Sequence, residues 1–174
     1  MSPASKLPMA LLLLTTALLL SAPQQLAGQP VLPEEHQRIE FLVGEWHTTS
    51  EFPDGSTAEG SLRYEWVLEG AWMRVEFHGD RPGGANWESH VMQRWNADEA
   101  LYEAWVFGAG GPPLRYTGTS EAPGQYRIEA PTDSGVRSGI DYHRQEDGSV
   151  YQENWVVENG TRRVTLRTNY RPAP

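Results

Sequence analysis

A period-two alternation of apolar and polar residues constrains this chain more than any other feature. In one segment Leu62, Tyr64 and Trp66 share a face, and the residues between them are polar or charged. The segments 73–78 and 163–170 alternate in the same way, and about ten short runs of this kind follow one another along the chain. Alternation with this period predicts β-strands that bury one face.

Turn-forming residues separate these runs. The turn signals lie at 53–56, 69–70, 79–86, 96–99, 108–113, 122–124, 146–148 and 159–160. The last of them, Asn159-Gly160, is the strongest local hairpin signal that a sequence can carry. Uniformly short connections favour a closed barrel, because a sandwich needs some long crossovers. The segment 34–42, which follows Pro33, is the only helical candidate. We therefore predict an all-β fold, an antiparallel up-and-down β-barrel of about eight to ten strands with a short N-terminal helix.

The first residues of the chain are typical of a secretory signal peptide. Lys6 is followed by the apolar run 9–20 and then by small residues that end at Ala27 and Gly28. The run is shorter than the ~20 apolar residues that a transmembrane helix normally needs. We expect a signal peptide over 1–28, a single domain over 29–174, and a periplasmic or secreted protein. Gln29 stands where a lipobox requires cysteine, so we expect no stable membrane anchor.

The composition excludes several kinds of chemistry. The chain contains no cysteine, which rules out disulfides, thiolate nucleophiles and cysteine-ligated zinc. Beyond residue 28 it carries 13 arginines against 23 acidic residues, a net charge of −10. An acidic chain without a basic cluster is not expected to bind nucleic acid or an anionic membrane surface.

The Gly44-x-Trp46 sequence directly after the helical candidate resembles the opening motif of the calycins, the lipocalin-related barrels. The resemblance implies that this Trp packs across the closed end of the barrel, against a basic side chain of the final strand. Arg163, Arg167 and Arg171 are the candidates, and we take Arg167 with Gly44 and Trp46 as the structural motif.

Further tryptophan motifs extend this resemblance from residue 39 to residue 171. They are 66–72, 94–105 and 154–155, and in this order they resemble a family of small exported bacterial calycin-like proteins without an assigned function. The characterised relatives of similar architecture are the nitrobindins, in which a histidine near the C-terminus binds heme. Here His143 is the last histidine, so heme binding is a disfavoured alternative and we predict no cofactor.

The polar residues of the strands do not mark a catalytic site. The five histidines do not pair at spacings that would place two ligands on one face, and we predict no metal. Glu103 lies on an apolar face, so we expect it either to pair with an arginine or to have a raised pKa. A barrel enzyme, an isomerase or hydrolase acting through Glu103, His90, His143 or Asp141, remains an alternative. We leave catalytic activity undecided and favour binding over catalysis.

The aromatic content is high for one small domain, with seven tryptophans and seven tyrosines. These rings either fill the interior of a small barrel or line a pocket within it, and the sequence leaves both possibilities open. We predict that the protein binds a small apolar or planar molecule. The predicted ligand-binding residues are Tyr64, Trp66, Trp105, Glu103, Tyr142 and Trp155. The sequence does not identify the ligand or the oligomeric state.

Overall fold

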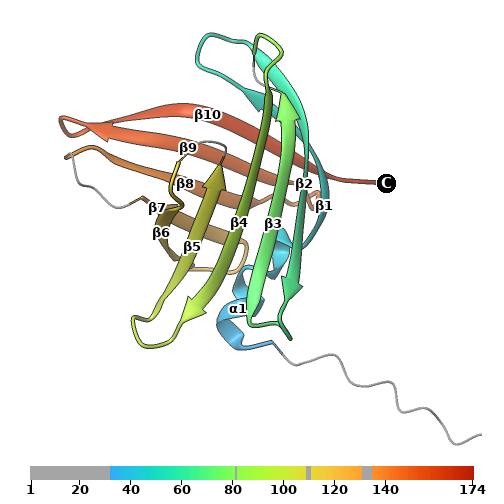
Figure 1. Cartoon of the computed structure of the whole chain (residues 1–174), viewed down its shortest axis with the longest axis vertical. Coiled ribbons are helices and arrows are strands. Elements are labelled where there is room, and N and C mark those ends of the chain that lie inside the picture. Colours follow the sequence, from blue (N-terminus) through green and yellow to red (C-terminus); the bar gives the residue numbers. More distant parts are fainter. Residues whose placement is uncertain (1–31, 81, 109–110, 131–134) are drawn as a thin grey trace, which may run out of the picture.

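In the computed structural model, ten antiparallel strands close into one barrel (Figure 1). The structure describes residues 32–80, 82–108, 111–130 and 135–174. The strands are β1 (Gly44–Glu51), β2 (Thr57–Val67), β3 (Trp72–Asp80), β4 (Asn86–Asn96), β5 (Leu101–Gly108), β6 (Leu114–Thr119), β7 (Gln125–Glu129), β8 (Arg137–Arg144), β9 (Val150–Glu158) and β10 (Thr161–Pro172). The predicted all-β barrel with a short helix before it is therefore confirmed. The predicted signal peptide over 1–28 lies outside the described residues.

Every strand pairs with its neighbours in the chain, and the pairing of β1 with β10 closes the ring. This is the up-and-down order that short hairpin connections allow. Asn159 and Gly160, which join β9 to β10, have φ values of 51° and 75°. A two-residue type I′ turn requires positive φ at both central positions, which Asn-Gly adopts at low cost.

A short helical segment closes one end of the barrel, the lower end in Figure 1. It consists of α1 (Glu34–Arg38) and the 3-10 turn η1 (Glu40–Leu42). The sequence predicted one helix over 34–42, whereas in the structure the α-helix stops before Ile39. Ile39 and Leu42 are fully buried among barrel side chains. We name the segment 34–42 the plug.

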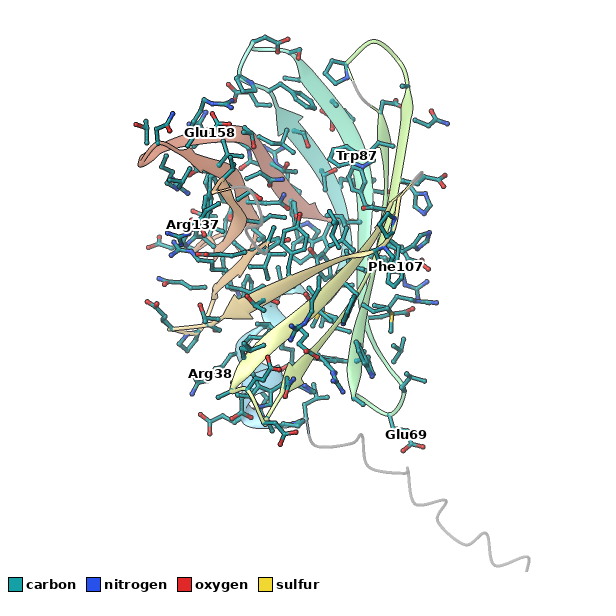
Figure 2. The ribbon with its side chains drawn as sticks, turned by 60° about the vertical axis from the view of Figure 1, so that its left-hand side comes forward. Arg38, Glu69, Trp87, Phe107, Arg137 and Glu158 are labelled. Carbon is teal, nitrogen blue, oxygen red and sulfur yellow. The ribbon has the colours of Figure 1, made fainter. Side chains whose placement is uncertain are left out.

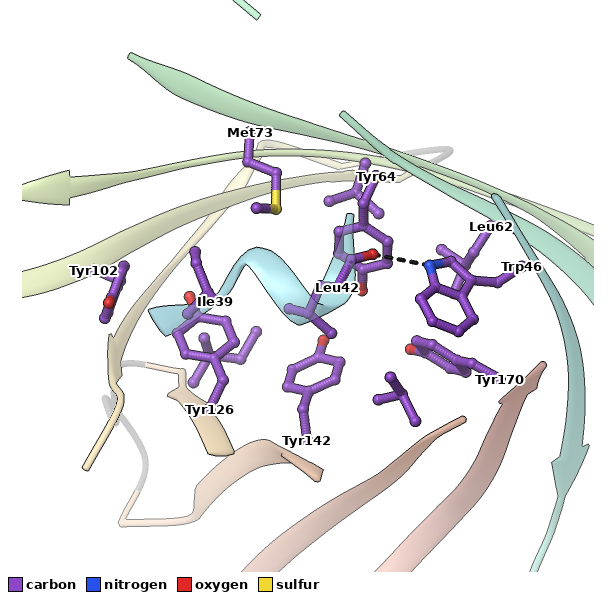
Figure 3. Close-up of a cluster of buried hydrophobic side chains, with 13 residues drawn as sticks. Ile39, Leu42, Trp46, Leu62, Tyr64, Met73, Tyr102, Tyr126, Tyr142 and Tyr170 are labelled. Carbon is purple, nitrogen blue, oxygen red and sulfur yellow. Dashed lines mark hydrogen bonds between the residues drawn. The ribbon is translucent and has the colours of Figure 1, made fainter. Parts of the chain in front are cut away.

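The plug is tied to the barrel by polar contacts as well as by apolar packing. The Trp46 indole donates a hydrogen bond of 2.8 Å to the Leu42 carbonyl, which Figure 3 shows as a dashed line. The Tyr102 hydroxyl donates to the Glu35 carbonyl, and Tyr126 packs edge-on against the Tyr102 ring. These contacts satisfy backbone carbonyls at the end of a helix too short to satisfy them itself.

The two faces of the barrel wall differ in charge. Alternate residues of each strand point inward, and the inward set forms one apolar cluster around the plug (Figure 3). The outward set carries ion pairs such as Arg63 with Glu65 at 2.8 Å and Arg137 with Glu129 at 2.8 Å. Figure 2 shows Arg38 and Glu69 at the plugged end and Trp87 towards the other end of the barrel.

In the part of the chain that the structure describes, no helix is long and apolar enough to cross a membrane.

Candidate functional site

A cavity of about 250 Å³ occupies the barrel interior on the side away from the plug. It reaches from the tyrosines above the plug to the end of the barrel at which β3 ends and β4 begins. All ten strands contribute inward residues to its lining, and Ile128 is the contribution of β7. The lining residues are Ser50, Leu62, Tyr64, Val75, Phe77, Trp87, Ser89, Val91, Gln93, Val106, Gly108, Tyr116, Ile128, Ile140, Tyr142, Gln152, Asn154, Leu166, Thr168 and Tyr170.

One side of the cavity is apolar. Val75, Val91 and Val106 lie opposite one another on β3, β4 and β5 and form a continuous row. β-branched side chains are stiff and pack well on a pleated surface. This row therefore presents a smooth apolar wall to whatever occupies the cavity.

The opposite side of the cavity is polar. Ser50, Thr168, Gln152 and Tyr142 are direct register neighbours across β1, β10, β9 and β8. The hydroxyls of Ser50 and Thr168 lie 3.0 Å apart and share a hydrogen bond. The polar row sits about halfway around the ring of ten strands from the valine row. The cavity is therefore mainly apolar on the valine side, where Ser89 and Gln93 of β4 are polar, and richer in hydrogen-bonding groups on the other side.

Three tyrosines form the floor of the cavity. The Tyr64 hydroxyl interacts with the hydroxyls of Tyr142 and Tyr170, and Tyr170 donates a hydrogen bond to the Gln152 side-chain oxygen. Burial, the largest cause, raises the pKa of all three phenols well above the ordinary value of 10.0. These hydroxyls therefore stay protonated near neutral pH and offer hydrogen bonds without charge.

Two aromatic rings stand at the mouth of the cavity. Phe77 and Trp87 meet edge to face, with ring centroids 5.0 Å apart. The Phe77 ring lies over two glycines, because a Cβ added to Gly79 would come within 2.6 Å of the Phe77 Cζ atom and one added to Gly60 within 3.1 Å of its Cε2 atom. The absent side chains of these glycines leave the space in which Phe77 lies along the wall.

Of the six predicted ligand-binding residues, Tyr64 and Tyr142 line the cavity. Trp66 also points inward, but it lies at the plugged end, where its ring stacks on His36 with centroids 4.6 Å apart. Trp66 is thus part of the packing around the plug and is not among the lining residues.

Glu103 and Trp105 lie on the outer wall of β5. Their neighbours Ala104 and Val106 point inward, and successive residues of a strand point to opposite faces. The Glu103 carboxylate accepts hydrogen bonds from Arg94 at 3.0 Å and Arg115 at 2.6 Å. Burial alone would raise the pKa of Glu103, but these hydrogen bonds outweigh it and lower the pKa. Of the two expectations for Glu103, the arginine partner is the one observed.

Trp155 occupies a similar place on the outer wall of β9. Its ring lies over Gly139, whose added Cβ would come within 2.6 Å of it, and the Arg162 guanidinium stacks 5.3 Å from the ring centroid. The exposed fraction of Trp155 is only 4 %, even though its side chain faces outward. A glycine below and an arginine above therefore bury this ring without placing it in the cavity.

Gly44 and Trp46 of the predicted motif lie at the plugged end, whereas Arg167 pairs with Glu51 at the other end of β1. Gly44 has a φ of 139°, and an added Cβ would sit 3.7 Å from the Trp46 indole nitrogen. The Trp46 ring contacts Tyr170 of the final strand, with centroids 6.2 Å apart. Arg167 lies on the outer face of β10, 3.7 Å from Glu153. Among the described residues, the side chain of the final strand that the structure records against Trp46 is a tyrosine.

The residues of the enzyme alternative do not come together in the cavity. Asp141 accepts hydrogen bonds of 2.6 Å from Arg127 and 3.0 Å from Arg162 on the outer wall, and Glu103 has its arginines there too. His90 and His143 are exposed and do not line the cavity. Within the described ranges, no group of three or more histidine, aspartate or glutamate side chains could hold a metal ion.

Sequence reasoning missed most of the polar row. Ser50, Gln152, Asn154, Thr168 and Tyr170 all line the cavity, yet none was among the predicted site residues. One signal was available: Thr48 and Ser50 share a parity with Trp46, so an inward Trp46 places both inside. The same argument places Gln152 and Asn154 inside once their register with β10 is known, and the sequence does not supply that register.

No model of a protein family and no curated protein matches the chain. Among solved structures, the S-type phycobiliprotein lyase CPES from Guillardia theta is similar, with a TM-score of 0.50, 10 % identity, and coverage of 78 % of this chain and 90 % of that one. A structure described as EF1p2_mFAP2b bound to DFHBI has a TM-score of 0.47 and 11 % identity, and covers 80 % of this chain and 99 % of that one. Likeness at this identity concerns the fold alone. The ten-stranded barrel fits a calycin-like fold, and no link to the nitrobindins is shown.

Proposed function

We propose that this protein binds a small, largely apolar molecule in the open part of its barrel. The observation that carries the proposal is the cavity of about 250 Å³. Protein interiors are close-packed, with few voids larger than a water molecule. An engineered apolar cavity of about 150 Å³ takes up benzene, so this cavity has room for a molecule of one or two rings.

The wall of the cavity supports a binding role. Most of the lining is aliphatic or aromatic, with a smaller number of polar side chains concentrated on β1, β9 and β10, which is the usual composition of small-molecule sites. The plug closes one end, so a ligand would enter past Phe77 and Trp87. We retain periplasmic or secreted localisation as part of the proposal, supported by the signal-like segment before residue 29.

Heme remains the weaker alternative. Among the described residues, the cavity is lined by no histidine, cysteine or methionine, and burial raises the pKa of the Tyr64, Tyr142 and Tyr170 phenols, which disfavours a tyrosinate ligand for iron. The final strand β10 (Thr161–Pro172) also contains no histidine. Titration of the protein with hemin, followed in the Soret region, tests this alternative directly.

Isothermal titration with 2-acetylnaphthalene, an uncharged two-ring ketone, tests the proposal. For a probe of this size we expect a Kd between about 10 µM and 1 mM. Val106→Phe places a ring in the cavity and should weaken binding by about tenfold or more. Phe107→Ser changes the exposed neighbour of Val106 on the outer wall and should leave the affinity unchanged.

The proposal fails if wild-type protein gives no binding heat at a probe concentration of about 1 mM. It also fails if the Val106→Phe variant, folded by circular dichroism, binds the probe as well as the wild type does. Equal losses of affinity for the probe in Val106→Phe and Phe107→Ser would indicate that the probe binds outside the cavity.

A further inference from the structure

The cavity and the outer wall differ sharply in charge. None of the described residues that line the cavity is Asp, Glu, Lys, Arg or His. The charged residues that alternate with the lining point outward, where they pair with one another: Glu153, between Gln152 and Asn154, accepts a hydrogen bond of 2.8 Å from Arg162. Arg63 and Glu65 flank Tyr64 and pair at 2.8 Å. The strands thus keep their charges on the outer surface.

An ionised ligand would therefore enter a cavity without a counter-charge. Moving an ion out of water costs several kcal/mol unless an opposite charge and hydrogen bonds compensate. The phenols at the floor supply no negative charge, because Tyr64, Tyr142 and Tyr170 stay protonated near neutral pH. Because the lining carries neither a cation nor an anion, it disfavours the binding of carboxylates and of ammonium ions alike.

The hydrogen-bonding groups on the polar side are already partly used by one another. The Gln152 side-chain oxygen accepts from Tyr170, and the Gln152 amide nitrogen donates to the Asn154 side-chain oxygen. Each of the two amide oxygens thereby accepts one hydrogen bond. The Asn154 amide nitrogen donates to no partner among the described residues, although Asn154 lines the cavity.

A second donor lies beside it. Ser50 and Thr168 share one hydrogen bond at 3.0 Å, so one of the two hydroxyl hydrogens remains available. A hydroxyl supplies one donor and an amide nitrogen supplies two. The unused capacity of this side therefore includes N–H and O–H donors, and a ligand that accepts hydrogen bonds would use it.

From this arrangement we infer that the ligand is an uncharged ring compound with a hydrogen-bond acceptor, such as a carbonyl or ring nitrogen, on one edge. The acceptor edge faces Asn154 and the Ser50–Thr168 pair, and the apolar face lies against the valine row of β3, β4 and β5. The inference rests on the proposed function, and it adds the charge class and the orientation of the ligand.

Three two-ring probes of nearly the same shape test the charge and the acceptor separately. They are 2-acetylnaphthalene, an uncharged acceptor; 2-naphthoate, an anion; and 2-isopropylnaphthalene, which has no acceptor. Near neutral pH we expect the ketone to bind about tenfold or more tightly than the carboxylate. Asn154→Leu should weaken the binding of the ketone by about fivefold to tenfold, and should leave 2-isopropylnaphthalene bound at least as tightly as in the wild type.

Binding of 2-naphthoate as tight as that of the ketone would overturn the uncharged class while leaving small-molecule binding intact. Equal effects of Asn154→Leu on the ketone and on the hydrocarbon would overturn the assigned orientation. Thr168→Val, which removes a hydroxyl with little change of shape, repeats the orientation test should Asn154→Leu fail to fold. Failure of all three probes to bind the wild type would instead contradict the proposed function itself.

Discussion

In the half of the barrel beside the plug, side chains from the helical segment and from several strands fill the interior, and Ile39, Leu42 and Met73 have no exposed surface. In the other half the same strands enclose a cavity of about 250 Å³. The strands contribute inward side chains to both halves, so the difference lies in the plug, which supplies side chains to one half alone. Packing stabilises the first half, and the second half leaves apolar surface unpacked where a ligand can bind.

The plugged half should dominate stability, and Leu42→Ala tests this most strongly. Truncating a fully buried leucine lowers the free energy of unfolding by about 2 to 5 kcal/mol, because the lost hydrophobic transfer energy and the cost of the new cavity add. Val106→Ala, which enlarges an existing cavity, should cost about 1.5 kcal/mol or less. Urea unfolding of both variants measures the difference, and equal losses would show that the two halves are equally packed.

The polar contacts that join the two halves should come next in effect. Tyr170→Phe removes the hydroxyl that binds the Gln152 oxygen and leaves that buried acceptor without its partner. We expect a loss of about 1 to 3 kcal/mol in the free energy of unfolding. Tyr116→Phe, at a cavity tyrosine to which the structure assigns no hydrogen bond, should change it by about 0.5 kcal/mol or less. A smaller loss for Tyr170→Phe than for its control would contradict the role of this contact.

Two glycines of the open half provide a finer comparison. Gly79→Ala places a Cβ within 2.6 Å of the Phe77 ring, so the ring must move, which we expect to lower the free energy of unfolding by about 1 kcal/mol. The displaced ring should narrow the mouth and weaken 2-acetylnaphthalene binding severalfold. At Gly108, also in the lining, an added Cβ meets nothing within 4 Å. Gly108→Ala is therefore the matched control, and calorimetric affinities that fall equally in both variants would refute this account.

The plug should also make stability depend on pH. His36 is buried, and its Nδ1 atom has no hydrogen-bond partner in the described residues. Burial lowers the pKa of His36 below its ordinary value of 6.5, although the Gly70 backbone and nearby Glu35 oppose this. The unfolded chain therefore binds the proton at higher pH than the folded chain does.

The expected consequence is a loss of stability as the pH falls below 6.5 and no contribution from His36 above it. We expect the Tm to fall by a few degrees between about pH 7.5 and pH 5.5. His36→Asn should reduce this fall. Glu103 and Asp141, whose pKa values are lowered, lose their stabilising effect only at more acidic pH, so an unchanged pH profile in His36→Asn would exclude the histidine as its cause.

The strands whose inner face was hardest to predict are those whose apolar residues face outward. In β5 both faces carry apolar residues, and the large side chains of Leu101, Trp105 and Phe107 form the outer wall while Tyr102 and Val106 point inward. Elsewhere on the outer wall, arginine side chains cover aromatic rings while their charged ends stay in water: Arg94 lies over Trp72 and Arg162 over Trp155. The apolar content of a face therefore did not identify the inside of this strand.

In β9 the difficulty has a second cause. Its inward residues include Gln152 and Asn154, whose polar side chains resemble an exposed face in the sequence. They lie inside because the register with β10 pairs Gln152 with Thr168 and places Asn154 opposite Leu166. A β-bulge between Val164 and Leu166 shifts that register, and a shift of one residue reverses which face points inward.

The sequence by itself determined the antiparallel barrel, the position of its turns other than the connection between β7 and β8, and the short helix before the first strand. These features depend on local chemistry: alternation within a strand, glycine and asparagine at turns, and the spacing between them. Only the tertiary structure decided which tryptophans face outward, which polar residues face inward, and that a cavity remains. Those properties depend on the register of strands far apart in the chain and on the summed volume of side chains that meet inside the closed ring, and neither is encoded in any single segment.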